Sequence, residues 1–320
     1  MSRFQNDAGN RSGLLLLDKK AGFTSFDSLA EAKKTFSTKK AGHTGTLDKF
    51  ATGLLLILIG RGVKLNFLFE KLEKEYLGTV LFGEETDTLD PEGAIIARGE
   101  IPSLKEVEAV LANFRGDILQ SPPEFSAIHI NGRRAYELAR EGKKPLMEKR
   151  PVTVHELEII AWNPPEARIR ACVSAGTYIR SLARDIALAA GTRARLETLK
   201  RTRIGPFRLA DSSGSPIGLD ASDKLHPLDF KLFNELSIPC YFIGEDDEKK
   251  FLNGQMLEPI ISNAALKPVE IKPNGLISNE VIIAGVFAKS SSNKHLDDEL
   301  LGVIENRCGK WEYRYVFNGN

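Results

Sequence analysis

A glycine- and threonine-rich loop directly before a long apolar run is the feature that most constrains how this chain folds. The loop reads Gly42-His43-Thr44-Gly45-Thr46-Leu47-Asp48, and the apolar run extends from Leu54 to Ile59. A lone acid such as Asp48 in a loop of this kind is ordinarily a cap or turn residue. His43 lies five positions earlier, so an extended chain separates the two by at most roughly 17 Å. Both side chains can therefore reach one nucleotide-sized ligand.

The loop resembles a segment of the bacterial tRNA pseudouridine-55 synthases of the TruB type. That family reads close to GHTGTLDPLATGLL, and this chain matches the first seven letters and then ATGLL. The resemblance implies that Asp48 is the catalytic aspartate. Lys49 and Phe50 stand where proline and leucine are usual. The missing proline removes a restraint on φ directly after the aspartate.

Composition sets wide limits on the class of protein. The chain has 320 residues, of which 42% are hydrophobic and 27% charged, which is ordinary for a globular protein with room for two domains. A net charge of +1 does not by itself indicate a nucleic-acid binder. Residues 241–320, however, hold nine lysine and arginine residues against twelve acidic ones. We therefore expect any basic surface in the first three quarters of the chain.

Cysteine and histidine usage predicts a cytoplasmic protein without a metal centre. The three cysteines, at 172, 240 and 308, are far apart and fit a reducing compartment. The five histidines show no paired ligand spacing. No apolar run approaches the roughly 20 residues that span a bilayer, and residues 1–13 lack the core of a signal peptide.

Several segments have clear secondary-structure signals. Leu14–Leu17 is typical of a buried strand, and Thr24 or Ser25 can cap a helix that runs to about Phe36. Residues 75–82 are expected to form a strand with Tyr76 on one face, and Ser103 opens a capping box for a helix. Lysines 33, 34, 39 and 40 precede the Asp48 loop, either as a solvated helix face or as a phosphate-binding track.

Residues 119–150 carry the densest basic stretch. Asn131-Gly132 is a strong hairpin signal. The segment resembles the family's PPxxSAxKxxGxxxYExAR insertion, which in the family grips RNA; His129 replaces a usual lysine there. We expect RNA-backbone contacts here, because the basic residues lack matched acids nearby; the alternative is an exposed hairpin without a ligand. The expected contacts are Arg133, Arg134, Lys143 and Lys144, with Arg201 from a second basic cluster at 193–203.

The segment Ser174-Ala175-Gly176-Thr177-Tyr178-Ile179-Arg180-Ser181 leads from an alternating strand into a helix with apolar spacing up to Ala190. Tyr178 and Arg180 are expected in the first turn, where free N–H groups and partial positive charge favour an anion. The stretch resembles the family's SxGTYIRSLxxD motif, with Ala175 where lysine is common.

The resemblance extends over residues 12–210 in several blocks that keep their order, and it implies a set of site residues. Arg180 is expected to hold the Asp48 carboxylate, with Asp90 competing for it before substrate arrives. Tyr76 would stack on the target base and assist proton transfer, and Tyr178 would hydrogen-bond near Arg180. The remaining candidates are His43 as the residue that fills the gap left by flipped nucleotides, Leu199 as an apolar wall, and Lys64.

The implied reaction turns uridine into pseudouridine at position 55 in the T-loop of tRNA. It breaks the N1–C1′ bond, rotates the base and rejoins it through C5, so no cofactor is expected. Two alternatives remain. The chain could be a tRNA-binding or tRNA-folding module with decayed catalysis, because Lys20, Lys49 and Ala175 depart from the pattern. It could also be a guide-RNA-dependent relative, although the basic insertion argues against a guide. We expect a monomer whose partner is the tRNA T-arm.

The expected fold is α+β. A mixed, largely antiparallel central sheet flanked by helices would form a catalytic domain over residues 1–235, including the insertion at about 119–150. Residues 236–320 would form a small β-rich domain, which the resemblance labels PUA-like. The aromatic residues of Trp311–Phe317 recur at period two, which favours a packed strand face over a base-stacking platform.

Overall fold

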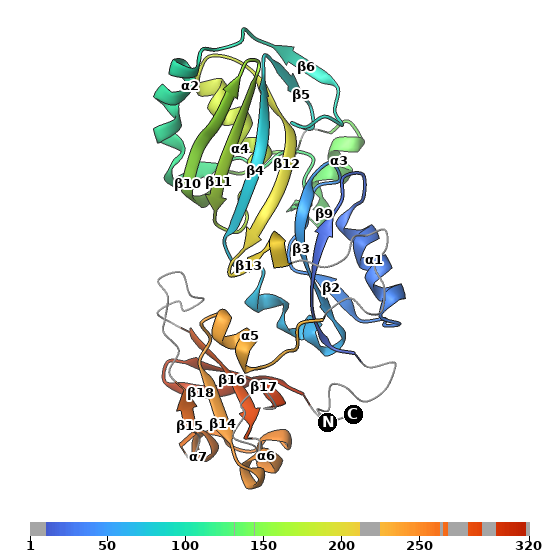
Figure 1. The fold of residues 1–320 in the computed structure, drawn as a ribbon, viewed down its shortest axis with the longest axis vertical. Coiled ribbons are helices and arrows are strands. Elements are labelled where there is room, and N and C mark those ends of the chain that lie inside the picture. Colours follow the sequence, from blue (N-terminus) through green and yellow to red (C-terminus); the bar gives the residue numbers. More distant parts are fainter. Residues whose placement is uncertain are drawn as a thin grey trace.

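The structure is a computed structural model that describes residues 11–130, 132–143, 145–211, 225–262, 265–267, 281–289 and 299–317. A long twisted sheet fills the upper part of the molecule, and a smaller sheet packs below it (Figure 1). Within these ranges, none of the helices has the length and apolar character needed to cross a membrane.

The central sheet confirms the predicted mixed, largely antiparallel topology. Its strands lie in the order β1-β3-β12-β4-β11-β10-β7, with β2 paired to β3 and β13 paired to β12. Only β3 and β12 run parallel. The bounds are β1 Gly13–Lys19, β2 Ala41–His43, β3 Thr52–Ile59, β4 Lys74–Phe82, β7 Gly116–Gln120, β10 Arg150–Asn163, β11 Glu166–Val173, β12 Ala194–Ile204 and β13 Phe207–Arg208.

Strands β1 and β3 are continuously apolar because both of their faces are buried. Leu14 and Leu16 face a core shared with the C-terminal sheet. Leu15 and Leu17 face the helix α1 (Ser25–Thr35). A strand covered on both sides has no solvent face to alternate with, so its sequence shows no period of two.

Three helices begin where the sequence indicates. Thr24 and Asp27 form a capping box at the start of α1. Ser103 and Glu106 form another at α2 (Leu104–Leu111). The helix α4 (Ile179–Ala189) packs with α2 on one face of the central sheet, and Tyr178 is its N-cap residue.

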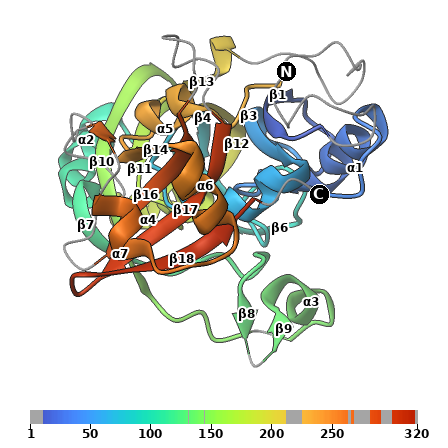
Figure 2. The same cartoon turned by 90° about the horizontal axis from the view of Figure 1, so that it is seen from below.

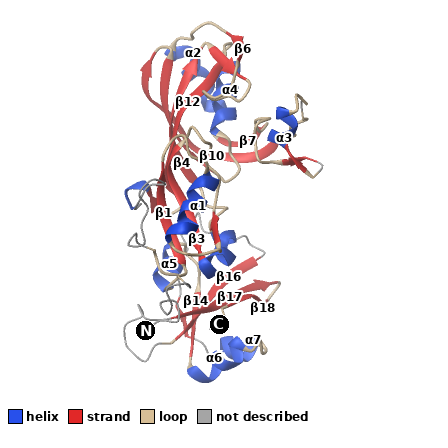
Figure 3. Ribbon diagram, turned by 90° about the vertical axis from the view of Figure 1, so that its right-hand side faces the viewer, coloured by secondary structure: helices blue, strands red, loops and turns tan. Residues whose placement is uncertain are grey.

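The basic insertion projects from the body of the molecule. It contains a short hairpin of β8 (His129–Ile130) and β9 (Arg133–Arg134), followed by α3 (Ala135–Arg140). Figures 2 and 3 show this unit standing away from the central sheet. A second small hairpin, β5 (Glu84–Thr86) and β6 (Ile95–Arg98), lies at the opposite end of the sheet from the C-terminal part.

The C-terminal sheet has the order β15-β14-β16-β17-β18. Its elements are α5 Phe230–Glu235, β14 Cys240–Ile243, α6 Glu245–Leu252, α7 Leu257–Ser262, β15 Ala265–Lys267, β16 Val281–Ala288, β17 Glu299–Arg307 and β18 Lys310–Val316. It packs against the central sheet through an apolar cluster that joins β1 and β3 to α5, β16 and β17.

The aromatic residues at the end of the chain pack in apolar clusters, as the sequence predicts, but they lie on two faces of β18 and not on one. Tyr313 pairs with Ile304 and packs inside the C-terminal part. Tyr315 pairs with Val303 instead and faces the core shared with the central sheet, where its ring lies 5.8 Å from that of Phe67. A register shift between these pairs turns the strand, because a bulge inserts one extra residue and reverses the alternation.

Gly53 at the start of β3 allows the close approach of β12. Its φ is +102°, and a Cβ there would lie 2.3 Å from the carbonyl oxygen of Arg201. We expect Gly53→Ala to lower the free energy of unfolding by about 2 kcal/mol or more, measured by urea denaturation. Gly42→Ala is the control, because its Cβ would meet only Val63, at 3.5 Å. Equal stability of the two variants would contradict this reading.

Candidate active site

The loop between β2 and β3 presents Asp48, and two side chains from distant elements fix its backbone. Ser25, at the start of α1, accepts a hydrogen bond from the backbone nitrogen of Leu47 at 2.8 Å and donates to the carbonyl oxygen of Leu47 at 3.1 Å. Ser25 is buried. The residue directly before Asp48 is therefore held through both its backbone N–H and its backbone C=O.

Arg201 supports the same loop from below, which corrects its predicted role as an RNA-backbone contact. Its side chain is 1% exposed. The guanidinium donates to the carbonyl oxygens of Leu54 at 2.8 Å, Gly45 at 3.1 Å and Thr46 at 3.4 Å. A buried guanidinium needs these acceptors. At 1% exposure, Arg201 offers almost no surface to a phosphate.

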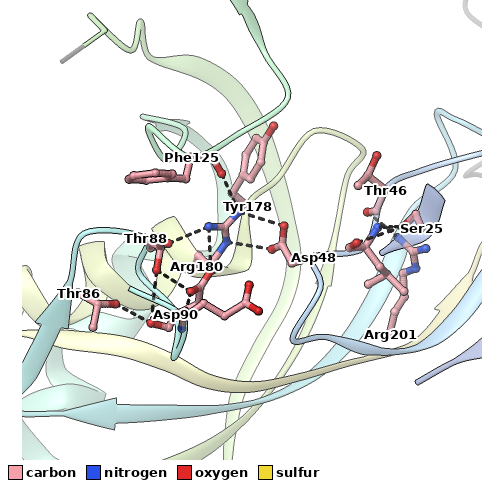
Figure 4. A network of polar contacts seen from close by, with 12 residues as sticks. Ser25, Thr46, Asp48, Thr86, Thr88, Asp90, Phe125, Tyr178, Arg180 and Arg201 are labelled. Atoms are coloured by element: carbon pink, nitrogen blue, oxygen red, sulfur yellow. Dashed lines mark hydrogen bonds and ion pairs between the residues drawn. The ribbon is translucent and has the colours of Figure 1, made fainter. Parts of the chain in front are cut away.

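Arg180 joins two carboxylates from separate loops (Figure 4). Its Nη2 donates to Oδ1 of Asp48 at 3.0 Å, and its Nε lies 2.9 Å from Oδ2. Its Nη1 donates to Oδ2 of Asp90 at 3.1 Å. Further bonds run to the carbonyl oxygens of Thr88 at 2.7 Å and Phe125 at 3.1 Å. The two-point contact fixes the direction of the Asp48 carboxylate.

The surroundings of Arg180 are themselves held in place. Asp90 accepts hydrogen bonds from the hydroxyl of Thr88 at 2.5 Å and the backbone nitrogen of Glu92 at 3.0 Å. Gln120 in β7 accepts from the backbone nitrogen of Tyr178 at 2.8 Å and donates to its carbonyl oxygen at 3.1 Å. The turn that starts α4 is therefore fixed to the sheet edge.

The electrostatics of Asp48 follow from this arrangement. Burial raises the pKa of the Asp48 carboxyl above its ordinary value. Arg180 opposes that rise without cancelling it, and the carboxylate of Asp90 adds to it. One third of the Asp48 side chain is nevertheless exposed, against 5% for Arg180. The free part faces a cavity, where the carboxylate is accessible to a ligand yet largely enclosed by protein.

That cavity, of about 1210 Å³, brings together most of the site residues that the sequence predicts. Tyr76 lies in the middle of β4 and is almost fully buried. Burial raises the pKa of the half-buried Tyr178, which keeps its hydroxyl protonated at neutral pH. The predicted residues on the cavity wall are His43, Asp48, Tyr76, Asp90, Arg134, Tyr178, Arg180, Leu199 and Arg201.

His43 sits in β2 with its Nδ1 atom buried and without a hydrogen-bond partner. Burial and the charge of Arg201 lower the pKa of its imidazole, which favours the neutral form. A neutral ring at the cavity wall presents a flat, uncharged surface to a base.

Sequence reasoning missed two buried lysines under the site. Lys19, at the end of β1, donates to the carbonyl oxygens of Phe23 at 2.7 Å and Lys49 at 3.4 Å. Lys74, at the start of β4, donates to those of Glu70 and Leu72. Burial lowers the pKa of each lysine to about 8. The sequence signal that could have revealed the buried Lys19 is its position at the end of an apolar strand.

The basic insertion contains an acidic residue that pairs with two of its basic residues. Arg133 and Lys143 both form ion pairs with Glu141, so the premise of unmatched charge is wrong for these two. Arg134 and Arg140 instead lie over the ring of Tyr136, at 5.9 and 5.4 Å, and all three line the cavity. Lys144 lies outside the described residues.

Lys64 is not part of the cavity wall. Its Nζ lies 5.9 Å from the centres of the Tyr315 and Phe317 rings, at the contact with the C-terminal sheet. Nearby, the guanidinium of Arg314 lies 3.8 Å from the centre of the Phe67 ring. Lys64 thus contributes to the packing between the two parts in this structure.

Comparison with solved structures shows which proteins share this fold. A Cbf5-Nop10-Gar1 complex contains a chain that superposes with a TM-score of 0.67 at 21% identity, covering 99% of this chain and 88% of that one. A chain of an H/ACA RNP bound to a substrate RNA gives 0.65 at 21%, covering 96% and 85%. These superpositions show that the chain shares the overall fold of those two proteins.

Sequence comparison identifies the family of the chain. The model of the TruB family pseudouridylate synthase N-terminal domain matches residues 33–179. The tRNA pseudouridine synthase B of Borreliella burgdorferi is 45% identical over 205 residues, 63% of this chain and 73% of that protein. That of Chromohalobacter salexigens is 34% identical over 315 residues, 96% of this chain and 94% of that protein. The chain belongs to the TruB family of pseudouridylate synthases.

The neighbouring charge of Asp90 gives a direct test of the site's electrostatics. Asp90→Asn removes a negative charge that raises the pKa of Asp48. Asp48 then no longer shares the Arg180 guanidinium with a second carboxylate. We expect the pKa of Asp48 to fall. Carbon-13 NMR of selectively labelled aspartate carboxyls over a pH series measures it. Asp185→Asn is the control, since Asp185 pairs with Arg184 instead. An unchanged or higher Asp48 pKa in Asp90→Asn would contradict this account.

Proposed function

We propose that this chain converts uridine to pseudouridine at position 55 in the T-loop of tRNA, with Asp48 as the catalytic carboxylate. The observation that carries the proposal is the two-point contact of Arg180 with Asp48 inside a cavity lined by Tyr76 and Tyr178. The relatives named tRNA pseudouridine synthase B support the choice of substrate, because one of them aligns with nearly the whole chain.

The residues can supply the steps of the isomerisation. The ionised Asp48 meets an electron-poor C1′ or removes the adjacent sugar proton. The N1–C1′ bond breaks, the base rotates, and C5 bonds to C1′. The proton lost from C5 is balanced by one gained at N1, so substrate and product are isomers. Arg180 keeps the carboxylate aimed at the sugar throughout.

The target uridine has to leave the stack of the T-loop to reach Asp48. Swinging a nucleotide out costs a few kcal/mol. Tyr76 offers an aromatic surface inside the cavity, and stacking of a base returns on the order of 1–3 kcal/mol. The apolar side of the same pocket is formed by Leu199, which packs with Tyr76 and Leu47 in one buried cluster.

Asp48→Asn tests the assigned chemistry. The amide keeps the shape of the side chain but cannot act as a nucleophile or base. We expect single-turnover formation of pseudouridine to fall by a factor on the order of 10²–10⁴ or more, with RNA affinity retained. Tritium release from a C5-labelled T-arm stem-loop measures the rate. Glu92→Gln, at another acid of the same cavity that is half exposed and paired with Lys49, is the control. Wild-type turnover by Asp48→Asn refutes the assignment.

The same assay separates the proposal from both alternatives. A binding or folding module with decayed catalysis would release no tritium even as the wild-type protein. A guide-dependent enzyme would be inactive on bare tRNA. We propose that the purified chain alone modifies an unmodified tRNA transcript, and that the T-arm contacts the cavity and the basic insertion. The division into residues 1–235 and a PUA-like 236–320 remains part of this proposal.

Two arginines with opposite environments test where RNA binds. Arg134 lines the cavity and is exposed, whereas Arg201 is buried under the Asp48 loop. We expect Arg134→Gln to reduce the slope of log affinity against log salt by about 1 without a change in stability. Arg201→Gln should lower the free energy of unfolding and leave that slope unchanged. Fluorescence anisotropy with a labelled T-arm and urea denaturation give the two readouts. The reverse pattern would restore Arg201 as a phosphate contact.

A further inference from the structure

Phe26 is an exposed aromatic residue at the wall of the catalytic cavity. It lies in the first turn of α1, and 72% of it is exposed. The described residues include other exposed large hydrophobic side chains, but Phe26 is the one aromatic among them and the one that lines the cavity. Single exposed hydrophobic residues are common on protein surfaces. An aromatic one that faces the reaction site calls for a separate explanation.

The fold itself makes no use of this side chain. The buried residues of α1 are Ser25, Ser28, Leu29 and Ala32, which share the face that packs on the sheet. Phe26 points away from that face. Burying a phenylalanine is worth about 1.5–3 kcal/mol relative to leaving it exposed, and none of this stabilisation is realised here. The exposed ring is therefore available for a partner that enters the cavity.

The position of Phe26 relative to Asp48 is fixed through Ser25. The Ser25 hydroxyl contacts the backbone of Leu47, so Phe26 follows a residue that touches the neighbour of Asp48. Figure 4 shows Ser25 on the other side of Asp48 from Arg180 and Phe125. Asp48 thus lies between Ser25 on one side and Phe125 on the other. A ligand with its sugar at Asp48 would extend toward Phe26 in one direction and toward the insertion in the other.

The charges around Phe26 suit an RNA strand. Lys49 also lines the cavity and is half exposed, with a loose contact of 3.6 Å to Glu92. A surface ion pair of this kind is weak. The neighbouring acid, Asp27, is engaged by the Thr24 backbone nitrogen and hydroxyl in the helix cap. An aromatic face beside an exposed ammonium is the usual arrangement for an unpaired nucleotide, with the base stacked and the phosphate near the cation.

We propose that Phe26 stacks on an unpaired base of the RNA substrate that neighbours the target uridine. It is a positioning residue, because it holds the strand while Asp48 acts on the sugar. The proposal rests on the proposed function for the identity of the substrate as RNA. Stacking of this kind contributes to binding in ground state and transition state alike, so its loss should appear in KM and not in kcat.

Substitutions that separate stacking from apolar packing test the proposal. With a T-arm stem-loop, we expect Phe26→Ala to raise Kd and KM about fivefold to 150-fold, with kcat unchanged. Phe26→Leu keeps an apolar side chain without a ring and should show most of the same loss. Met256→Ala is the matched control, since Met256 is 75% exposed and lies in the C-terminal part. Thermal unfolding should be the same for all of these variants.

A tryptophan at this position reports stacking directly. Phe26→Trp should bind the stem-loop at least as well as the wild-type protein. Its additional fluorescence should be quenched when RNA binds, measured as the difference from the wild-type protein with its two native tryptophans. A fully duplex RNA of the same length, which offers no unpaired base, should quench it far less.

The outcomes distinguish this proposal from the proposed function. Wild-type affinity of Phe26→Ala or Phe26→Leu, or an unquenched Phe26→Trp, overturns the role of Phe26 while the wild-type protein still makes pseudouridine. A drop in kcat without a change in KM would also overturn it, because it would mean that the ring acts on the chemical step. Absence of pseudouridine from the wild-type reaction, together with quenching of Phe26→Trp, would instead refute the enzyme and retain the base-stacking residue.

Discussion

The pairing of one guanidinium with two carboxylates is the constraint on which the site depends. Arg180 and Asp90 are almost fully buried, and Asp48 is two-thirds buried. A buried charge without a partner is strongly destabilising, so neither loop can move away from Arg180 at little cost. One positive charge for two negative ones also leaves an excess of negative charge. That excess, together with burial, explains why the pKa of Asp48 is raised although an arginine contacts it on two sides.

The position of Asp48 is set by parts of the chain that are far apart in sequence. Ser25 holds Leu47 from α1, and Arg201 holds Gly45 and Thr46 from β12. Arg201 can do so because β12 runs parallel to β3 at this point, which brings its guanidinium under the loop. A catalytic side chain on a loop gains precision only when its backbone is fixed by rigid elements. The departures at Lys49 and Phe50 fall just after this fixed stretch, so the lost proline restraint does not free Asp48.

Local signals in the sequence account for most of the secondary structure. Thr24 and Ser103 start helices because their hydroxyls satisfy free N–H groups, and this depends only on neighbours. The geometry of the site does not follow from local signals, because Arg180 and Asp48 are 132 positions apart. Their contact is predicted only by the resemblance to the family. Arg201 was assigned to RNA because charge alone does not say which way a strand residue points. Glu141 lies two positions from Lys143, so that ion pair is visible in the sequence. Its contact with Arg133, eight positions away, depends on how the hairpin and α3 are placed.

Burial at the site shifts the pKa values of acidic and basic side chains in opposite directions. It raises the pKa of Asp48 and lowers that of Lys19 to about 8. The role proposed for Asp48 needs the ionised carboxylate, which is the main form only above the raised pKa. Lys19 is charged below about pH 8, where its ammonium stabilises the negative charge above it. The pH range in which both groups carry their charges is therefore narrower at both ends than for free side chains. The enclosure that holds the Arg180–Asp48 contact therefore restricts this pattern of charges from the acidic side through Asp48 and from the basic side through Lys19.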